Sequence, residues 1–337
     1  MTGGSLSGVR RLRSGYLKGR LLGSVLVFIA VYLLNFILPR LEPGNFVSAL
    51  GQQFLTHEQR QRILAMFGLN EPPWVQFVKY VEQTFLSFPP NYGVSFSHYP
   101  LSVWTVVMAY LPWTLLLIVT SQLIAWSTGI LLGAWLGWRQ GPRSNSLMLG
   151  VSTFMWGVPS YWLATILIFV FAIRLHFFPP ALTGVEAVTS FNLAWVATVL
   201  NHAFLPILTL VILNLPAHAT VMRNTMVSLK QEDFMIAAEA RGLRSRTLIL
   251  GHAARNALLP SVTRLALTFG DILSGAYLVE IIYSYPGMGY LTAQSVFSRD
   301  YPVLQGVFFF SALLVIVANI LADIAYVFLD PRVEYVS

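Results

Sequence analysis

The sequence has no cysteine among its 337 residues, which excludes disulfide bonds, thiolate metal sites and cysteine nucleophiles. Charged residues are also scarce, at 10% of the chain, whereas soluble domains carry roughly 25%. Hydrophobic residues make up 56%, and the mean hydropathy is +0.66. A water-soluble protein of this composition would have too little polar surface to cover its core. We therefore expect much of the chain to lie in lipid.

Motifs that carry chemistry are missing too. The sequence contains no Gly-x4-Gly-Lys-Ser/Thr phosphate loop, no nucleophile elbow and no His-Glu-x-x-His zinc motif. We expect no catalytic residue, no cofactor, no metal site and no ATP binding by a phosphate loop. The chain is predicted not to be an enzyme.

Long apolar runs are what the sequence has instead, and about 20 helical residues cross the hydrocarbon layer. Helices are the expected form, because a spanning segment must satisfy its backbone hydrogen bonds internally. A signal peptide is the alternative for the first run, but no cleavage-site pattern follows it. We predict an all-α protein with six transmembrane helices, at residues 21–39, 112–137, 146–173, 203–222, 260–283 and 303–328. The second, third and sixth of these are expected to be ordinary membrane helices.

The distribution of Lys and Arg predicts the orientation. With six spans, one side of the membrane receives most of the cations: Arg10, Arg11, Arg13, Lys18, Arg20, Arg139, Arg143, Arg223, Lys230, Arg241, Arg244, Arg246, Arg255 and Arg332. The other side receives Arg40, Arg60, Arg62, Lys79, Arg174 and Arg299. Because cytoplasmic loops carry the excess of cations, we expect both termini in the cytoplasm of a cell-membrane protein. The net charge of +7 then reflects topology and attraction to anionic lipid, so nucleic acid is not an expected partner.

A segment of about 70 residues separates the first two spans and reads as a small folded external cap. It has a helical pattern at 57–66 and is punctuated by Glu71-Pro72-Pro73 and Phe88-Pro89-Pro90. Residues 101–110 favour an interfacial helix leading into the second span, with a plain loop as the alternative. We divide the chain into an N-terminal region with the first helix and cap (1–107) and a membrane core (108–331), which contains a cytoplasmic loop (223–259).

That loop carries the most informative pattern. Acidic Glu232 and Asp233 precede an Ala-rich stretch, which suits a helix start at the positive end of the dipole. Gly242 stands where a helix ends, and a second, basic helix is expected from Ser245 to Arg255, running to Pro260 at the membrane. An ordinary amphipathic connector with solvated cations would show the same periodicity.

A resemblance separates these readings. Ala237, Ala238 and Gly242 match the EAA loop of ABC importer permeases, and Ile236 stands where the general motif has Glu. The stretch His252 to Pro260 is similar to the form found in the oligopeptide, dipeptide and nickel permease subfamily. Further matches to that subfamily are 68–72, 91–96, 158–162 (its proline kink in the third span), 279–280, 285–289, 299–306 and 329–332.

This resemblance to the "B"-type permease of that family implies the fold, the partners and the site. The implied fold is that of a type I ABC importer permease. The implied partners are a second homologous permease, two ATPase domains, an extracytoplasmic solute-binding protein and membrane lipid. The solute would be a peptide, with oligosaccharides and nickel complexes as alternatives. The implied ATPase-coupling residues are Ala237, Ala238, Glu239, Ala240, Arg241, Gly242, Leu243, Arg244 and Arg246.

Ionisable residues inside predicted spans leave other functions to weigh. Asp271, Glu280 and Asp323 would suit a proton relay, or would be paired or partly hydrated near span ends; the implied use of ATP favours the second reading. His202 and His218 read as packing residues rather than ligands. A secondary transporter and an intramembrane enzyme are the rival classes, but neither duplicated halves nor a catalytic motif are present.

Overall fold

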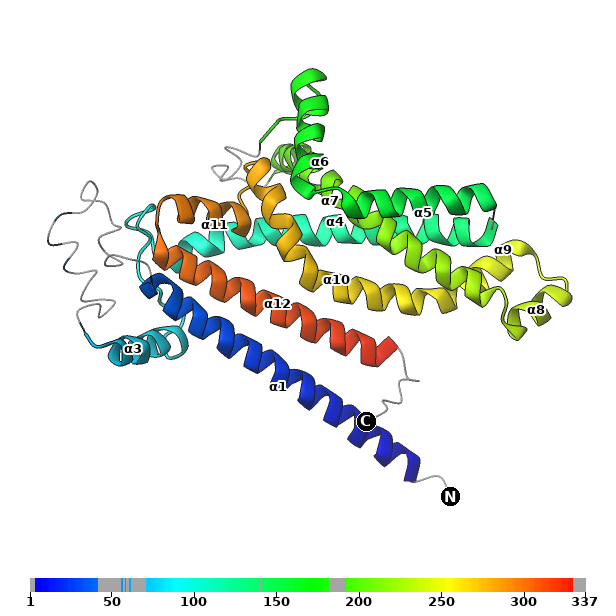
Figure 1. Cartoon of the computed structure of the whole chain (residues 1–337), viewed down its shortest axis with the longest axis horizontal. Helices are drawn as coiled ribbons and strands as arrows, with labels where there is room; N and C mark the ends of the chain where they lie inside the picture. Colours follow the sequence, from blue (N-terminus) through cyan, green and yellow to red (C-terminus); the bar gives the residue numbers. More distant parts are fainter. Residues whose placement is uncertain are drawn as a thin grey trace. The chain divides into compact units, whose positions relative to one another are not determined.

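The computed structural model describes residues 4–41, 56, 58, 61, 71–139, 141–181 and 192–329. The helical pattern expected at 57–66 falls mostly outside these residues. In chain order the helices are α1 (Gly4–Leu41), α3 (Pro73–Phe85), α4 (Val103–Arg139), α5 (Pro142–Gly157), α6 (Ser160–Leu167), η1 (Ile168–Arg174), α7 (Leu193–Leu229), α8 (Asp233–Ala240), α9 (Ser245–Thr247), η3 (Leu248–Ala253), α10 (Ala254–Ile282), α11 (Met288–Phe297) and α12 (Tyr301–Leu329) (Figure 1). Across the described ranges the only β-type pairing is an isolated bridge, Val94 with Ser102, which confirms the all-α class.

Several of these helices suit a bilayer. Within the described residues, four segments are long and apolar enough to cross it: Leu22–Leu41, Val103–Arg139, Leu193–Leu229 and Tyr301–Leu321. Ser146–Gly157 with Ser160–Arg174 forms a fifth candidate if a bent pair counts as one span. The predicted span at 260–283 lies in the 29-residue helix α10, which is not among these candidates. The number of six spans stays a prediction.

The third predicted span differs from the ordinary helix we expected. The chain bends by 99° between α5 and α6, at Val158 and Pro159. Proline disfavours the helical conformation in the residue before it, and Val158 is extended, with φ −81° and ψ 117°. Pro159 then starts the new helix as its N-cap. The resemblance predicted a kink here, but the size of the bend makes this a broken or re-entrant span.

The chain folds as two compact units. Unit 1 comprises residues 1–18, 115–285 and 317–337, and unit 2 comprises residues 19–114 and 286–316. In unit 1, α10 packs against α6 and α7, and α5 packs against α7. The Tyr283 hydroxyl lies 3.0 Å from the Thr209 hydroxyl and donates to the Ala164 carbonyl at 3.3 Å, which joins α10, α7 and α6.

Three glycines of α4 bring its backbone against α7. A Cβ atom built on Gly129 would lie 2.8 Å from the His218 Cβ. One on Gly133 would press against the Ala219 carbonyl oxygen, and one on Gly137 would lie 2.7 Å from the Met226 Cβ. These separations are shorter than van der Waals contact. The four-residue spacing places the three glycines on one helix face, which we call the glycine seam.

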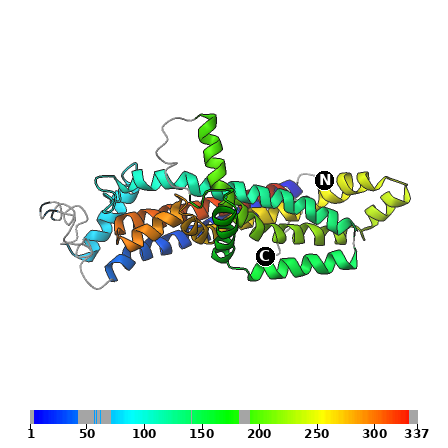
Figure 2. The same cartoon turned by 90° about the horizontal axis from the view of Figure 1, so that it is seen from above.

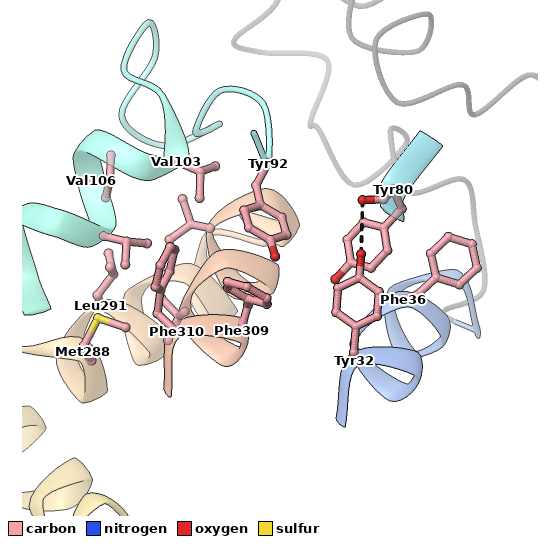
Figure 3. Packing of buried hydrophobic residues seen from close by; sticks show 13 residues of the cluster. Tyr32, Phe36, Tyr80, Tyr92, Val103, Val106, Met288, Leu291, Phe309 and Phe310 are labelled. Carbon is pink, nitrogen blue, oxygen red and sulfur yellow. Dashed lines mark hydrogen bonds between the residues drawn. The ribbon is translucent and has the colours of Figure 1, made fainter. Parts of the chain in front are cut away.

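Unit 2 is built around an aromatic core, shown in Figure 3. Its buried members come from α1, the external segment, α4, α11 and α12, and include Tyr32, Tyr92, Val103, Leu291 and Phe309. The expectation of an interfacial helix at 101–110 is wrong. Val103 and Val107 are fully buried, and these residues are the first turns of the continuous helix α4. Their apolar side chains pack inside unit 2 rather than facing lipid.

Asp300 ties the external segment to the start of α12. This fully buried carboxylate accepts hydrogen bonds from the Ser95 hydroxyl and from the Ser97 amide and hydroxyl. Its other oxygen accepts from the Val303 amide at 3.3 Å, as an N-cap does. All these donors are neutral, and those from Ser95 and Ser97 fix the loop at 95–98 against the start of α12.

Candidate functional site

The segment between α7 and α10 forms the predicted helix, glycine turn and second helix. In both views of the chain it lies at the end of unit 1, beyond the ends of α7 and α10 (Figures 1 and 2). α8 begins as expected: Glu232 is its extended N-cap and Asp233 lies in its first turn. Negative charge there is favourable at the positive end of the helix dipole.

Gly242 ends α8 in a Schellman turn. Its φ is +75°, in the left-handed region that glycine adopts without a Cβ penalty. The Gly242 amide donates to the Glu239 carbonyl at 2.9 Å, and the Leu243 amide donates to the Ala238 carbonyl at 3.4 Å. These two hydrogen bonds are the pair that defines the Schellman motif. A Cβ on Gly242 would meet nothing within 4 Å. The glycine is therefore required by backbone conformation, and the space beside it is open.

The second helix is longer than predicted. It begins at Ser245, passes through a π-type turn from Leu248 to Ala253 and continues as α10 to Ile282. Pro260 lies inside α10 rather than ending the helix. A proline in a membrane helix is tolerated where neighbouring groups and local π-type adjustment satisfy the freed backbone. The segment that carries α8 and the Gly242 turn is thus joined to α10 through α9 and η3 without a break.

Two inward residues anchor α8. Met235 and Ala238 are 3% and 1% exposed, and they share a core with Met222 and Met226 of α7 and Leu248 of η3. They are three residues apart, so they lie on the same face of α8. The rest of α8 is free of this core.

The outward surface of the segment carries the other predicted residues. The exposed ones are Ala237, Glu239, Ala240, Arg241, Gly242, Leu243 and Arg244. The Arg241 Nε donates to the Ala237 carbonyl at 3.3 Å, and the side chain of Arg246 lies outside the described residues. Of the predicted residues whose side chains the structure describes, only Ala238 faces inward.

Phe234 and Ile236 also belong to this surface, and sequence reasoning missed them as site residues. They are 41% and 55% exposed. A usable signal was present: Phe234, Met235 and Ile236 are consecutive, and three successive helical residues cannot all face one core. Phe234 and Ile236 are two residues apart, so they expose apolar side chains on different sides of α8. Leu243, just beyond the glycine turn, is a third exposed apolar side chain of this tip.

The polar residues singled out inside predicted spans lie elsewhere. His218 is buried, with its Nε2 3.1 Å from the Gln122 Oε1, and the His202 Nδ1 lies 2.8 Å from the Thr198 carbonyl. Both contacts fit packing residues. Glu280 is 1% exposed, so the expectation of partial hydration is wrong for it. The side chains of Asp271 and Asp323 lie outside the described residues.

Comparison with known proteins identifies the kind of chain. The family described as binding-protein-dependent transport system inner membrane component matches residues 129–335. The chain belongs to this family. It is therefore a multi-pass membrane component of a transport system. This membership favours the permease interpretation over the two rival classes, a secondary transporter and an intramembrane enzyme.

Individual members of this family align over nearly the whole chain. The oligopeptide transport system permease protein AppB of Bacillus subtilis (strain 168) is 30% identical over 96% of this chain and 100% of its own length. The di/tripeptide transport system permease protein DppB of Pseudomonas aeruginosa (strain UCBPP-PA14) is 31% identical over 91% and 95%. The dipeptide transport system permease protein DppB of Escherichia coli (strain K12) is 29% identical over 94% and 98%. The chain is thus similar, over 91% to 96% of its length, to permeases whose names specify peptides.

Proposed function

We propose that this transport component carries peptides across the cell membrane and is driven by ATP that separate ATPase subunits hydrolyse. The support is the peptide substrate in the names of its full-length relatives. Oligosaccharides and nickel complexes are the alternatives that the sequence resemblance implies. A second homologous permease, two ATPase domains and an extracytoplasmic solute-binding protein complete the transporter.

The segment from α8 to Arg246 is proposed as the contact with an ATPase. The observation that carries this proposal is the glycine turn with exposed apolar side chains before and after it. Phe234, Ile236 and Leu243 are exposed although they belong to a packed helix and its cap. Small Ala237 and Ala240 let a partner approach closely. Such a helix tip suits a groove that receives its exposed apolar side chains.

The flanking cations would set the orientation of that contact. Arg241 and Arg244 are exposed, and Arg246 follows them in the chain. At the rim of an interface, such charges guide association more than they add affinity. Movement of the bound ATPase would then be passed to α7 and α10, which the Met235 and Ala238 anchor joins to α8.

The substitution Gly242→Val tests this coupling. Valine would have to adopt a left-handed conformation at a cost of about 1 to 2 kcal/mol, and its branched side chain would occupy the open space that the partner needs. We expect normal insertion but loss of peptide uptake, through failed docking or uncoupled ATP hydrolysis. Uptake and ATPase activity of the whole transporter in vesicles are the measurements.

Gly23→Val provides the matched control. Gly23 lies in α1, has no positive φ and has nothing within 4 Å of a built Cβ, so the same change there should leave uptake normal. If Gly242→Val supports normal ATP-coupled uptake at normal expression, the segment is only a connector.

The orientation can be tested by single-cysteine labelling, since the native chain has no cysteine. In the proposed topology both termini and Arg244 are cytoplasmic, and Tyr99 is external. The side chains of Arg244 and Tyr99 are exposed. Tyr80 of the external cap is 7% exposed, so a cysteine there would label poorly. A cysteine at Tyr99 should react with an impermeant reagent added to whole cells, and one at Arg244 only after lysis. The reverse pattern would invert the map.

A further inference from the structure

Helix α10 exposes a stripe of residues with polar side chains or a disrupted backbone hydrogen bond. Asn256, Pro260 and Arg264 are all exposed, and their spacing of four residues places them along one side of the helix. Pro260 has no N–H, so it cannot donate to the Asn256 carbonyl four residues before it. The stripe therefore combines a cation, an amide and a backbone carbonyl that has lost its helical donor.

Arg264 lies near the middle of the membrane. It is close enough to His218 of α7 for its charge to act on the imidazole ring, and a Cβ built on Gly129 of α4 would lie 2.8 Å from the His218 Cβ. Gly129 is about 15 Å along α4 from Arg139, at 1.5 Å per residue. The Arg139 Cζ lies 4.8 Å from the Trp135 ring centroid, and such cations and aromatic rings gather at membrane surfaces. Half of the roughly 30 Å hydrocarbon layer thus separates Arg264 from that surface.

Contacts on another side of α10 hold this stripe outward. Ala257 and Ser261 are buried. The Trp126 indole donates to the Ser261 carbonyl at 3.1 Å, and the Ser261 hydroxyl donates to the Met222 sulfur at 3.6 Å. Rotating α10 to bury Arg264 would break these contacts and move a charge into the packed core, where a charge without compensation is very costly. The exposure of the stripe is therefore fixed by the packing of unit 1.

Lipid is a poor neighbour for this stripe. An ionisable side chain at membrane depth almost always faces the bundle interior or a water-filled cavity, and such residues mark substrate and ion pathways. Contacts between membrane helices instead favour small residues that let backbones approach, as the glycine seam of α4 does. A second permease opposite α10 would enclose the stripe as one wall of a water-filled path.

A guanidinium selects its ligand by shape as well as by charge. Its planar fork of N–H donors matches a carboxylate with two parallel hydrogen bonds. Because it has five donors, Arg264 can hold a carboxylate while it keeps a contact within the chain. Linear peptides of every length and sequence share one carboxylate, at the C-terminus. A single cation in the path can therefore guide many different peptides.

We propose that Arg264 binds the C-terminal carboxylate of a peptide that passes along α10, while Asn256 contacts the peptide backbone. This inference rests on the proposed function of peptide transport. Arg264 is then a specificity residue of the path. It favours solutes that carry a carboxylate and holds them near the middle of the membrane, between entry and release.

Uptake of two peptides tests this contact. Trialanine and its C-terminal amide differ only at the carboxylate, and ATP-driven uptake is measured in vesicles with equal amounts of the whole transporter and its solute-binding protein. Arg264→Gln should lower trialanine uptake roughly tenfold, the effect of losing a hydrogen bond between charged groups, and should change amide uptake less than about twofold. Arg264→Lys should keep most of the trialanine uptake, because it keeps the charge. Comparing each variant with the native transporter for the same peptide cancels the selectivity of the solute-binding protein.

Two results would overturn the assignment. An equal loss for both peptides would place Arg264 in the fold or in the contact with the second permease, and unchanged trialanine uptake in Arg264→Gln would remove it from the path. A native transporter that takes up no peptide would instead contradict the proposed function itself, before any variant is compared.

Cysteine labelling tests the water-filled path without a measurement of uptake. Arg264→Cys in the whole transporter should react with a charged methanethiosulfonate reagent, and trialanine with the solute-binding protein should slow the reaction. Leu131→Cys is the matched control, because Leu131 is 71% exposed and lies two residues from Gly129, at a similar depth. That cysteine should stay unlabelled, since a charged reagent does not enter lipid. If both cysteines react alike, or neither reacts, the stripe does not line a separate water-filled path and the proposal is wrong.

Discussion

The short helices α8 and α3 are both fixed to longer helices, but by opposite means. α8 is anchored by two side chains, Met235 and Ala238, in an apolar core. α3 is anchored by stacked rings and by a hydrogen-bonded polar face, with the Tyr32 and Tyr80 rings 4.6 Å apart. Removing one anchor should free α8 easily, whereas α3 has several independent supports. The comparison shows that α8 is held by fewer independent contacts than α3.

The largest effect is expected for Tyr80→Ala, which removes the central support of α3. Truncating a buried aromatic ring lowers stability by about 3 to 5 kcal/mol, and the Asn35 amide loses one of its two acceptors, the other being the Gln305 carbonyl. Burial raises the pKa of Tyr80, so its hydroxyl stays protonated and this loss should not depend on pH near neutrality. Thermal denaturation of the purified protein in detergent measures the effect.

Tyr80→Phe is the matched control for that experiment. It keeps the ring and removes one hydrogen-bond acceptor, which should lower the free energy of unfolding by about 1 kcal/mol. Equal melting temperatures for Tyr80→Ala and Tyr80→Phe would show that ring stacking does not hold α3.

A smaller effect is expected for Met235→Ala in the anchor of α8. Loss of a buried methionine costs about 2 to 3 kcal/mol, and α8 should open locally while the membrane helices stay folded. Hydrogen exchange at the amides of Ile236 to Leu243 should become faster. Ile236→Ala removes a side chain of similar size that is 55% exposed, so exchange in that variant should stay as in the native protein. The same rate in both variants would contradict the assigned anchor.

The smallest effect on stability is expected for Phe234→Ser and Ile236→Ser. Both residues face outward, so stability should change by less than about 0.5 kcal/mol. If they enter an ATPase groove, each substitution should weaken association roughly tenfold, as measured by titration of the ATPase subunit. Phe297→Ser alters a side chain that is 88% exposed in unit 2 and should leave that affinity unchanged. Unchanged affinity in all three variants would remove the apolar tip from the proposed interface.

Features set by local chemistry were predictable from the sequence. The start of α8 follows from Glu232 and Asp233, and its end follows from Gly242, whose φ is +75°. Apolar runs located most of the long helices for the same reason, because length and hydropathy are properties of each segment alone.

Features set by contacts between distant segments were not predictable. The helical pattern of 101–110 does not show that Val103 and Val107 pack against Gly306 and its neighbours. Pro159 indicates an interruption, but the 99° bend depends on what surrounds it. The exposure of Phe234 and Ile236 follows from which face of α8 meets α7, and hydropathy makes them look like core residues.

The glycine seam between α4 and α7 also limits how these helices can move. Each glycine sits against particular α7 atoms, such as the Ala219 carbonyl beside Gly133. Sliding one helix along the other would move each glycine away from its α7 contact. The fit would return only after a shift of four residues, about 6 Å, which brings the next glycine to the same place. Within unit 1 the pair therefore has one preferred axial register, and a force applied to the end of α7 displaces α4 with it. Any motion of these helices during transport should be a tilt of the pair as one rigid body rather than a slide.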